Sequence, residues 1–135
     1  MNPLRRFLTG SGRLPDPLRA ELANEGFVIL EEGLPGSVTY RHLRAPGRRA
    51  NWRRDAVSGA IAITTRRLVV WTGRVKQIDV PLRHPLRQAI QVSLDKPGQI
   101  CFVHHAETNP QVSGQFEVRL RTTQAERIAE FLTSN

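Results

Sequence analysis

The chain has 135 residues, of which 39% are hydrophobic and 24% charged, values typical of a globular protein with one domain. This composition excludes a long disordered chain, a collagen-like repeat and a coiled coil. Cys101 is the only cysteine, so an intramolecular disulfide is excluded. No apolar run approaches the length of a membrane span, and together these features favour a cytoplasmic location.

Positive charge is concentrated in one part of the sequence. The chain carries 20 basic and 12 acidic residues, a formal net charge of +8, and 18 of the basic residues are arginine. Between Arg41 and Arg87 there are eleven arginines and Lys76 against only Asp55 and Asp79, so this stretch carries +10 and the remainder −2. Such a local field favours a polyanionic partner, either nucleic acid, an anionic membrane or an acidic protein. A solvated face without a partner is the competing interpretation.

We expect residues 1–15 to form an N-terminal extension and residues 16–135 to form a single domain. The first ten residues place three apolar side chains at helical spacing, too few for stable membrane insertion. Asp16 and Pro17 predict a helix over residues 17–25, because Asp can cap free backbone N–H groups and Pro fits the first helical position. Gly26 ends this helix, and Leu18 and Leu22 share the face that would lie over a core.

After Gly26 the hydrophobic period becomes strand-like and predicts an antiparallel β-meander over residues 27–121. The first two strands are expected to form a hairpin around the turn Leu34-Pro35-Gly36, and the polar stretch Arg44–Ser58 is expected to be a loop. The predicted strands are Phe27–Glu32, Ser37–Leu43, Gly59–Thr65, Arg67–Thr72, Val75–Leu82, Ala89–Leu94, Gln99–His104 and Gln115–Arg121, with a polar loop over Ala106–Gly114 before the last.

The last strand and the segment after it carry the clearest patterns in the chain. Thr123 and Glu126 form a capping box, which predicts a helix over residues 123–133. Its apolar stripe would close a small antiparallel barrel. We therefore predict a mainly β (α+β) fold, a small antiparallel β-barrel of about seven strands with a C-terminal capping helix and a short N-terminal helix. The inward residues are Phe116, Val118 and Leu120 on the strand, with Glu117, Arg119 and Arg121 outward, and Ala125, Ile128, Ala129 and Leu132 on the helix.

Two short segments add a resemblance to this element order. The segment from Gly59 to Trp71 contains Thr-x-Arg-Arg-Leu between two strands and resembles a hairpin of bacterial pleckstrin-homology-like (PH-like) and GRAM-like domains. The run Ile78-Asp79-Val80-Pro81-Leu82 is similar to their strand-plus-Pro segment. The resemblance covers roughly Phe27–Leu132. It implies a PH-like barrel and a non-enzymatic binding or adaptor domain for a phospholipid headgroup or a protein segment.

The sequence departs from one feature of that superfamily. Eukaryotic members that bind phosphoinositides carry a lysine and arginine signature in the first hairpin. In the corresponding segment Phe27–Leu43, Arg41 is the only lysine or arginine. The departure argues against phosphoinositide specificity.

The strongest candidate site is the predicted loop Pro46–Asp55, where two arginine pairs flank one tryptophan. Guanidinium groups bind phosphates bidentately, and tryptophan can stack on a base or lie at the headgroup level of a bilayer. Arg66 and Arg67 are adjacent beside a strand and should point to opposite faces, so that one joins this patch and the other pairs with an acid such as Asp79. The candidate ligand-binding residues are Arg48, Arg49, Trp52, Arg53, Arg54 and Arg66.

Catalytic and metal-binding interpretations find little support. The histidine pair His104-His105 lies in a predicted strand, where neighbours project oppositely and cannot readily share one metal. Glu31 and Glu32 face apart for the same reason, and Cys101 in an apolar strand is expected to be a buried, inert thiol. We therefore expect no enzymatic activity, no catalytic residues, no metal and no cofactor.

The sequence thus predicts a non-enzymatic PH-like module that binds anionic lipid headgroups or an acidic protein surface through its Arg/Trp segment. It would be cytoplasmic and peripheral to the inner face of the membrane. A nucleic-acid-binding basic β-barrel is the first alternative, although Trp52 is the only aromatic residue inside the densest arginine run. A structural domain that oligomerises through a sheet edge is another.

Overall fold

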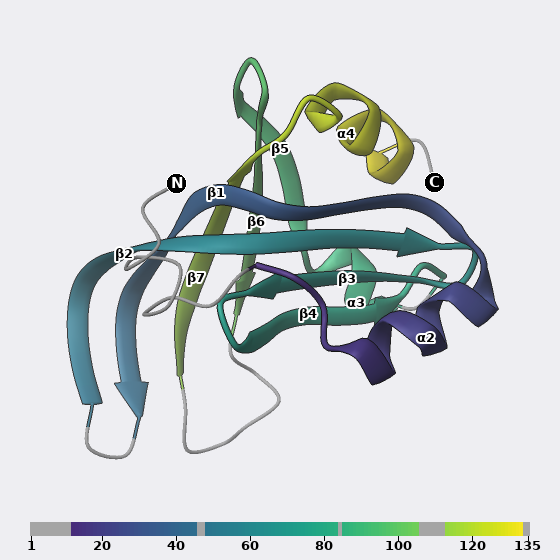
Figure 1. Ribbon diagram of the computed structural model, residues 1–135. Coiled ribbons are helices and arrows are strands. Elements are labelled where there is room, and N and C mark those ends of the chain that lie inside the picture. The colour runs from purple at the N-terminus through teal and green to yellow at the C-terminus, as the bar shows by residue number, and fades with distance from the viewer. Residues whose placement is uncertain (1–11, 46–47, 84, 106–112, 134–135) are drawn as a thin grey trace. The chain divides into compact units, whose positions relative to one another are not determined.

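Seven strands and three helices make up the parts of the chain that the computed structural model describes, residues 12–45, 48–83, 85–105 and 113–133 (Figure 1). The first ten residues and nearly all of the predicted loop Ala106–Gly114 lie outside these ranges. In chain order the elements are α2 (Asp16–Glu25), β1 (Phe27–Ala45), β2 (Arg48–Thr64), β3 (Arg67–Thr72), β4 (Val75–Pro81), α3 (Pro85–Gln88), β5 (Gln91–Lys96), β6 (Gln99–His105), β7 (Ser113–Arg121) and α4 (Ala125–Thr133).

The seven strands belong to one sheet with the order β4-β3-β2-β1-β7-β6-β5. Every pairing whose register is resolved is antiparallel. The predicted fold class, mainly β with seven antiparallel strands, an N-terminal helix and a C-terminal helix, is therefore confirmed. The short helix α3 was not predicted.

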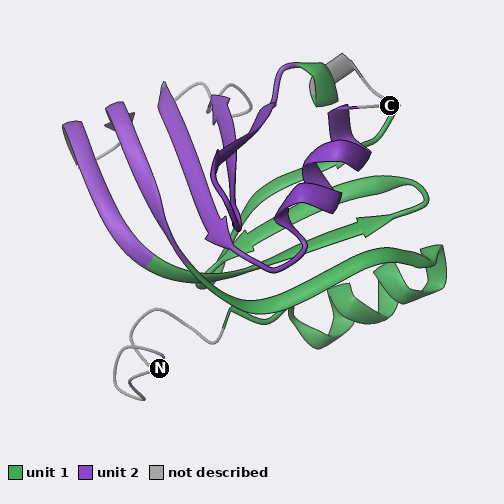
Figure 2. Cartoon of the chain, turned by 90° about the horizontal axis from the view of Figure 1, so that it is seen from above, with its two compact units in different colours: residues 1–35, 57–88, 135 green, residues 36–56, 89–134 purple. Residues whose placement is uncertain are grey.

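Contacts between residues group the chain into two compact units, coloured separately in Figure 2. Unit 1 comprises Met1–Pro35, Val57–Gln88 and Asn135, and unit 2 comprises Gly36–Ala56 and Ala89–Ser134. Each of the long strands β1 and β2 contributes one part to each unit.

In unit 1 both faces of the β2–β3 pair are buried. Ile61 lies opposite Val70 on one face, and Ala62 lies opposite Val69 on the other. The second face is covered by α2, whose buried Leu22 packs in one cluster with Ala62 and Val69. The small side chains of Ala60 and Ala62 on β2 let the helix approach closely. Because both faces of β2 are buried here, its sequence is apolar at consecutive positions and not at alternate ones. The cluster consists of Leu14, Leu22, Ala60, Ala62 and Val69, with Leu18, Phe27, Leu30 and Trp71 packed against it.

In unit 2 the predicted inward face of β7 is part of the core. Val118 lies between Val38 of β1 and Phe102 of β6, and all three are fully buried. Leu120 lies opposite Ile100 in the same way. Helix α4 packs against β5 and β6. Three residues of its predicted apolar stripe, Ala125, Ile128 and Leu132, are buried, and the fourth, Ala129, is half-buried. The burial of Val118, Leu120 and the helix residues confirms the inward side of both patterns, whereas Phe116 is half-buried and Glu117, predicted outward, is buried.

The predicted hairpin around Leu34-Pro35-Gly36 is wrong, because β1 runs without interruption through these residues. Gly36 is paired with Leu120, and a Cβ atom built on it would overlap the carbonyl oxygen of Arg119. Gly33 has a φ of 69°, and its N–H donates to the carbonyl of Gly12 at 3.0 Å. These glycines therefore permit a close strand approach and a local irregularity in one long strand, not a turn.

The predicted loop Arg44–Ser58 is also wrong. Arg44 and Ala45 end β1, and residues 48–58 form the first part of β2, which is the neighbour of β1 in the sheet. Strand pairing along β1 overrides the weak β propensity of this arginine-rich segment. The predicted strand Gly59–Thr65 is only the end of a longer one.

Both helices begin differently from the predictions. The N-cap of α2 is Pro15, which makes no side-chain cap, and Asp16 lies inside the first turn. Gly26 ends the helix as predicted, with a φ of 91° and its N–H donating to Leu22 and Ala23 carbonyls. Glu126 of α4 accepts the Gly98 N–H at 3.2 Å, tying the helix to the β5–β6 turn in place of closing a capping box.

Candidate functional site

The structure places five of the six predicted ligand-binding residues on one strand segment. Arg48, Arg49, Trp52, Arg53 and Arg54 lie in the first part of β2, in unit 2, and not in a loop. Arg66 lies in the turn between β2 and β3, in unit 1, and its side chain is exposed. The site is therefore an extended segment, which we call the β2 segment, residues 48–55.

Strand geometry separates the side chains of this segment onto two faces. The Nε atom of Arg53 donates to Oδ1 of Asp55 at 3.1 Å, so residues 53 and 55 share one face. Trp52 and Arg54 consequently project from the other face, because successive side chains alternate in a strand. The two side chains of the predicted pair Arg53-Arg54 therefore cannot converge on one point.

A second polar contact joins this part of β2 to β1. Arg44 donates from its Nη2 atom to the side-chain oxygen of Asn51 at 3.1 Å. The β1–β7 register shifts between Arg41 and Arg44, and His42 there has a φ of 55°. A bulge of this kind increases local twist and changes the direction of the strand.

The two tryptophans of the protein have opposite environments. Trp71 in β3 is partly buried, and its Nε1 donates to the carbonyl of Gly73 at 2.9 Å. Trp52 is 59% exposed, the highest value of any large hydrophobic side chain in the described parts of the chain. An exposed indole among charged neighbours is a feature of binding surfaces and not of a packed core.

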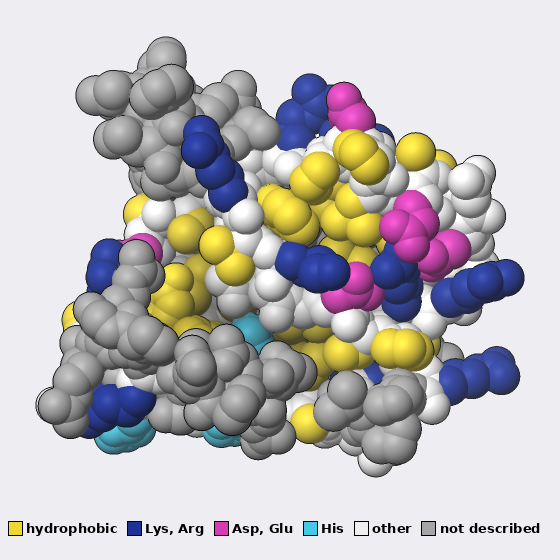
Figure 3. Space-filling model, turned by 90° about the horizontal axis from the view of Figure 1, so that it is seen from below, with side chains coloured by type: hydrophobic (Ala, Val, Ile, Leu, Met, Phe, Trp, Pro, Cys, Tyr) yellow, Lys and Arg dark blue, Asp and Glu magenta, His cyan; other side chains and the backbone are white. Residues whose placement is uncertain are grey.

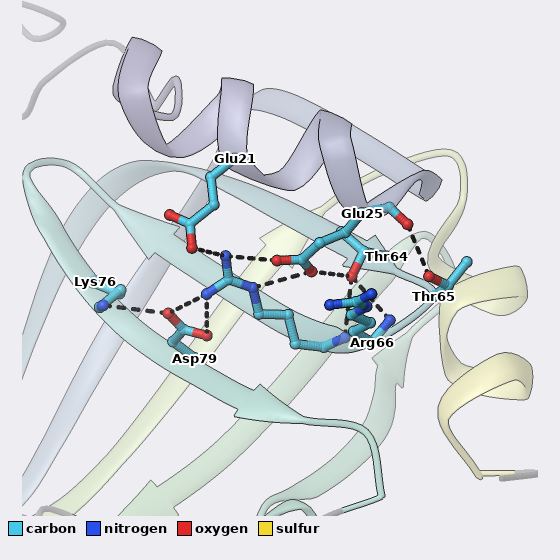
Figure 4. Close-up of polar contacts among 8 residues, drawn as sticks. Glu21, Glu25, Thr64, Thr65, Arg66, Lys76 and Asp79 are labelled. Carbon is cyan, nitrogen blue, oxygen red and sulfur yellow. Dashed lines mark hydrogen bonds and ion pairs between the residues drawn. The ribbon is translucent and has the colours of Figure 1, made fainter.

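Arg67, by contrast, is held in unit 1 by three carboxylates, those of Glu21, Glu25 and Asp79, which Figure 4 labels. Its Nη2 lies 2.9 Å from Glu21 and 3.0 Å from Glu25 on α2, and its Nη1 lies 3.1 Å from Asp79 on β4. Burial would lower the pKa of Arg67, but hydrogen bonds and charge from Glu25 and Asp79 outweigh it and raise that pKa. The prediction that one of the two adjacent arginines, Arg66 and Arg67, is structural and pairs with an acid such as Asp79 is confirmed for Arg67.

The two glutamates on α2 were missed at the sequence level. Glu21 and Glu25 are four residues apart and therefore share one helix face. That spacing could have shown that they belong together, but not that Arg67 is their partner. The Thr64 hydroxyl also donates to Glu25 at 2.8 Å, so the cluster fixes α2 to β2, β3 and β4.

A second charged cluster lies on β7 in unit 2. Glu117 is on the predicted outward face but is only 6% exposed, because Arg41 and Arg119 lie against its carboxylate. Burial would raise the pKa of Glu117, and the hydrogen bonds from these two arginines lower it below its usual range. Arg119 also donates to Asp95 at 3.0 Å. On the surface seen in Figure 3, acidic side chains likewise lie beside basic ones.

The reactive residue types in β6 have ordinary structural surroundings. Cys101 is buried, and burial raises the pKa of its thiol. Burial, with a contribution from the charge of His105, lowers the pKa of His104 to about 4, and its ring lies 5.2 Å from that of Phe116. Among the described residues, no three His, Cys, Asp or Glu side chains are grouped as metal ligands.

Comparisons with known proteins do not extend this description. No protein-family model matches the chain, and no characterised protein sequence matches it. Across the described ranges, none of the helices has the length and apolar character needed to cross a bilayer.

Proposed function

We propose that this protein is a non-enzymatic binding module of PH-like type that attaches to anionic lipid surfaces through the β2 segment. The observation that carries the proposal is the 59% exposure of Trp52 beside the exposed Arg53 and Arg54. An indole lies favourably at the headgroup level of a bilayer, and guanidinium groups bind lipid phosphates.

The charge distribution supports the same surface. Arg41, Arg67 and Arg119 are each paired with acidic side chains. Arg54 makes no ion pair with any residue in the described ranges, and its side chain is exposed. Arg54 of the β2 segment thus offers positive charge to a partner, whereas Arg41 and Arg67 of the +10 stretch are paired with acidic side chains within the fold.

The architecture supports the PH-like part of the proposal. An antiparallel sheet of seven strands followed by one C-terminal helix packed on β5 and β6 is the element order that the resemblance implies. The extended Arg/Trp segment favours a lipid surface over nucleic acid, since single-strand platforms usually stack several aromatic side chains and this segment supplies only Trp52.

Vesicle co-sedimentation tests the proposal. The full chain is mixed with phosphatidylcholine vesicles, or with vesicles containing phosphatidylserine, at low and high salt. Binding should occur only on the anionic vesicles and should weaken with salt. Absence of binding at low salt contradicts the proposal, and so does stronger binding to a single-stranded oligonucleotide or an acidic protein than to vesicles.

A matched pair of variants locates the site. Reversal of Arg48, Arg49, Arg53 and Arg54 to Glu should abolish binding. Reversal of four arginines that are exposed elsewhere changes the net charge equally and should leave most of the binding. Equal losses in the two variants would show that net charge and not the β2 segment is responsible. The control arginines are Arg74, Arg83, Arg121 and Arg127.

A further inference from the structure

We infer that the β2 segment contacts the bilayer through one face only, that of Trp52 and Arg54, and that it responds to surface charge without selecting a particular lipid headgroup. The inference rests on the proposed function and goes beyond it, because it names both the contacting face and the kind of anion recognised.

The contact between Arg53 and Asp55 identifies the face that is not used. This pair, at 3.1 Å, brings a carboxylate beside the guanidinium group, so its combined charge is close to zero. Asn51 lies on the same face of the strand as Arg53 and Asp55, and its side chain accepts a hydrogen bond from Arg44. These side chains already have partners within the fold, and the nearby carboxylate repels an anionic surface.

The opposite face combines the two groups that a bilayer requires. Trp52 and Arg54 are both exposed and lie two residues apart on the same side of the strand, a separation of about 7 Å along its axis. An indole at the interface and a guanidinium group at phosphate level can be accommodated side by side on a plane of lipids.

The same geometry argues against a built pocket for one headgroup. A selective site directs several donors to within about 3 Å of one phosphate. Along an extended strand the side chains of residues 52–55 diverge onto two faces, and among these four residues only Arg54 adds a guanidinium group to the face of Trp52. Anions on neighbouring lipids can be contacted, but one phosphate cannot be enclosed by these side chains.

The first test compares headgroups at constant surface charge. Phosphatidylcholine vesicles carry phosphatidylserine, phosphatidylglycerol or phosphatidylinositol 4-phosphate in amounts that give equal zeta potential. Affinities should agree within about threefold, and soluble inositol 1,4,5-trisphosphate should not compete at matched ionic strength. A preference above about tenfold for one headgroup, or competition by the soluble phosphate, overturns the inference.

The second test compares two charge reversals that differ only in face. Arg54→Glu should weaken binding by about tenfold or more, and Arg53→Glu by less than about threefold, since about one kcal/mol per surface-facing charge corresponds to about fivefold. Trp52→Ala should resemble Arg54→Glu. Circular dichroism checks that each variant is folded, which the exposure of these side chains predicts.

The outcomes separate the two claims. If the wild-type chain binds none of the vesicles, the proposed function itself fails. If it binds, but Arg53→Glu and Arg54→Glu lose affinity equally, or one headgroup is selected, the proposed function stands and this inference is wrong.

Discussion

Replacement of Arg67 by Met should release part of the attachment of α2 to the sheet. The side chain of Arg67 is 16% exposed, and its partners Glu25 and Asp79 are 15% and 18% exposed. The substitution keeps much of the aliphatic volume and removes the cation. It therefore leaves two largely buried carboxylates without their principal partner.

The size of the effect follows from that burial. Breaking a buried pair costs about 3–5 kcal/mol of folding free energy, and breaking an exposed pair about 0–1 kcal/mol. Lys76 remains 3.3 Å from Asp79, and the Thr64 hydroxyl remains hydrogen-bonded to Glu25 at 2.8 Å. We therefore expect Arg67→Met to lower the free energy of unfolding by about 2–3 kcal/mol.

Urea unfolding followed by circular dichroism measures this difference, and the adjacent Arg66 provides the control. Arg66 is exposed, so Arg66→Met should change the free energy of unfolding by less than about 0.5 kcal/mol. The reasoning is refuted if Arg67→Met is no more destabilising than Arg66→Met.

Three further predictions concern unit 2. Gly36→Ala should lower the free energy of unfolding in urea by about 3 kcal/mol or more, because the added Cβ forces β1 away from β7. Gly98→Ala is the control: it has open space but a φ of 76°, and should cost about 1–2 kcal/mol. Equal costs would contradict the close approach of β1 and β7 at Gly36. The lowered pKa of Glu117 stabilises the fold above its unfolded pKa, and this contribution is lost as pH falls through the folded value. Glu117→Gln should therefore be destabilising at pH 7, and denaturant titrations should show the gap narrowing as pH falls below the ordinary carboxyl value of 4.5. A constant gap would refute the assignment. The pKa of His104 is about 4 in the folded protein and 6.5 ordinarily, so the wild-type protein should lose stability as pH falls from 6.5 to 4. In thermal unfolding, His104→Phe should reduce this dependence of stability on pH. An unchanged dependence would contradict the effect of burial.

The parts of the fold that were predictable are those with local signals. Strand β3 was predicted with its observed bounds, because a short continuous apolar run, residues 68–71, is followed by a turn glycine, Gly73. The apolar stripe of α4 was predicted equally well from helical spacing. In each case the residues that decide the structure are neighbours in the sequence.

The errors came from residues whose role depends on distant partners. Gly36 follows a proline, as in many turns, but it lies against the backbone of Arg119 on β7, and no local sequence pattern reveals that contact. The Arg/Trp segment has the composition of a loop, but its neighbour in the sheet is β1. Burial of Glu117 likewise depends on Arg41, a residue far away in the chain.

The candidate site was predicted from its residue types as a loop, but these residues lie on a strand. The exposure of Trp52 and Arg54 agrees with the predicted binding role, but the strand assigns Arg53 to the other face. Composition identified the residue types, and only the backbone could separate them into faces.

The most direct test of membrane attachment is the fluorescence of Trp52 in a Trp71→Phe variant, where it is the only tryptophan. The emission should shift to shorter wavelength on phosphatidylserine-containing vesicles, and lipids brominated near the headgroup region should quench it, while phosphatidylcholine vesicles alone should cause neither change. An emission spectrum that is identical with and without anionic vesicles, at low salt, would contradict attachment through the β2 segment.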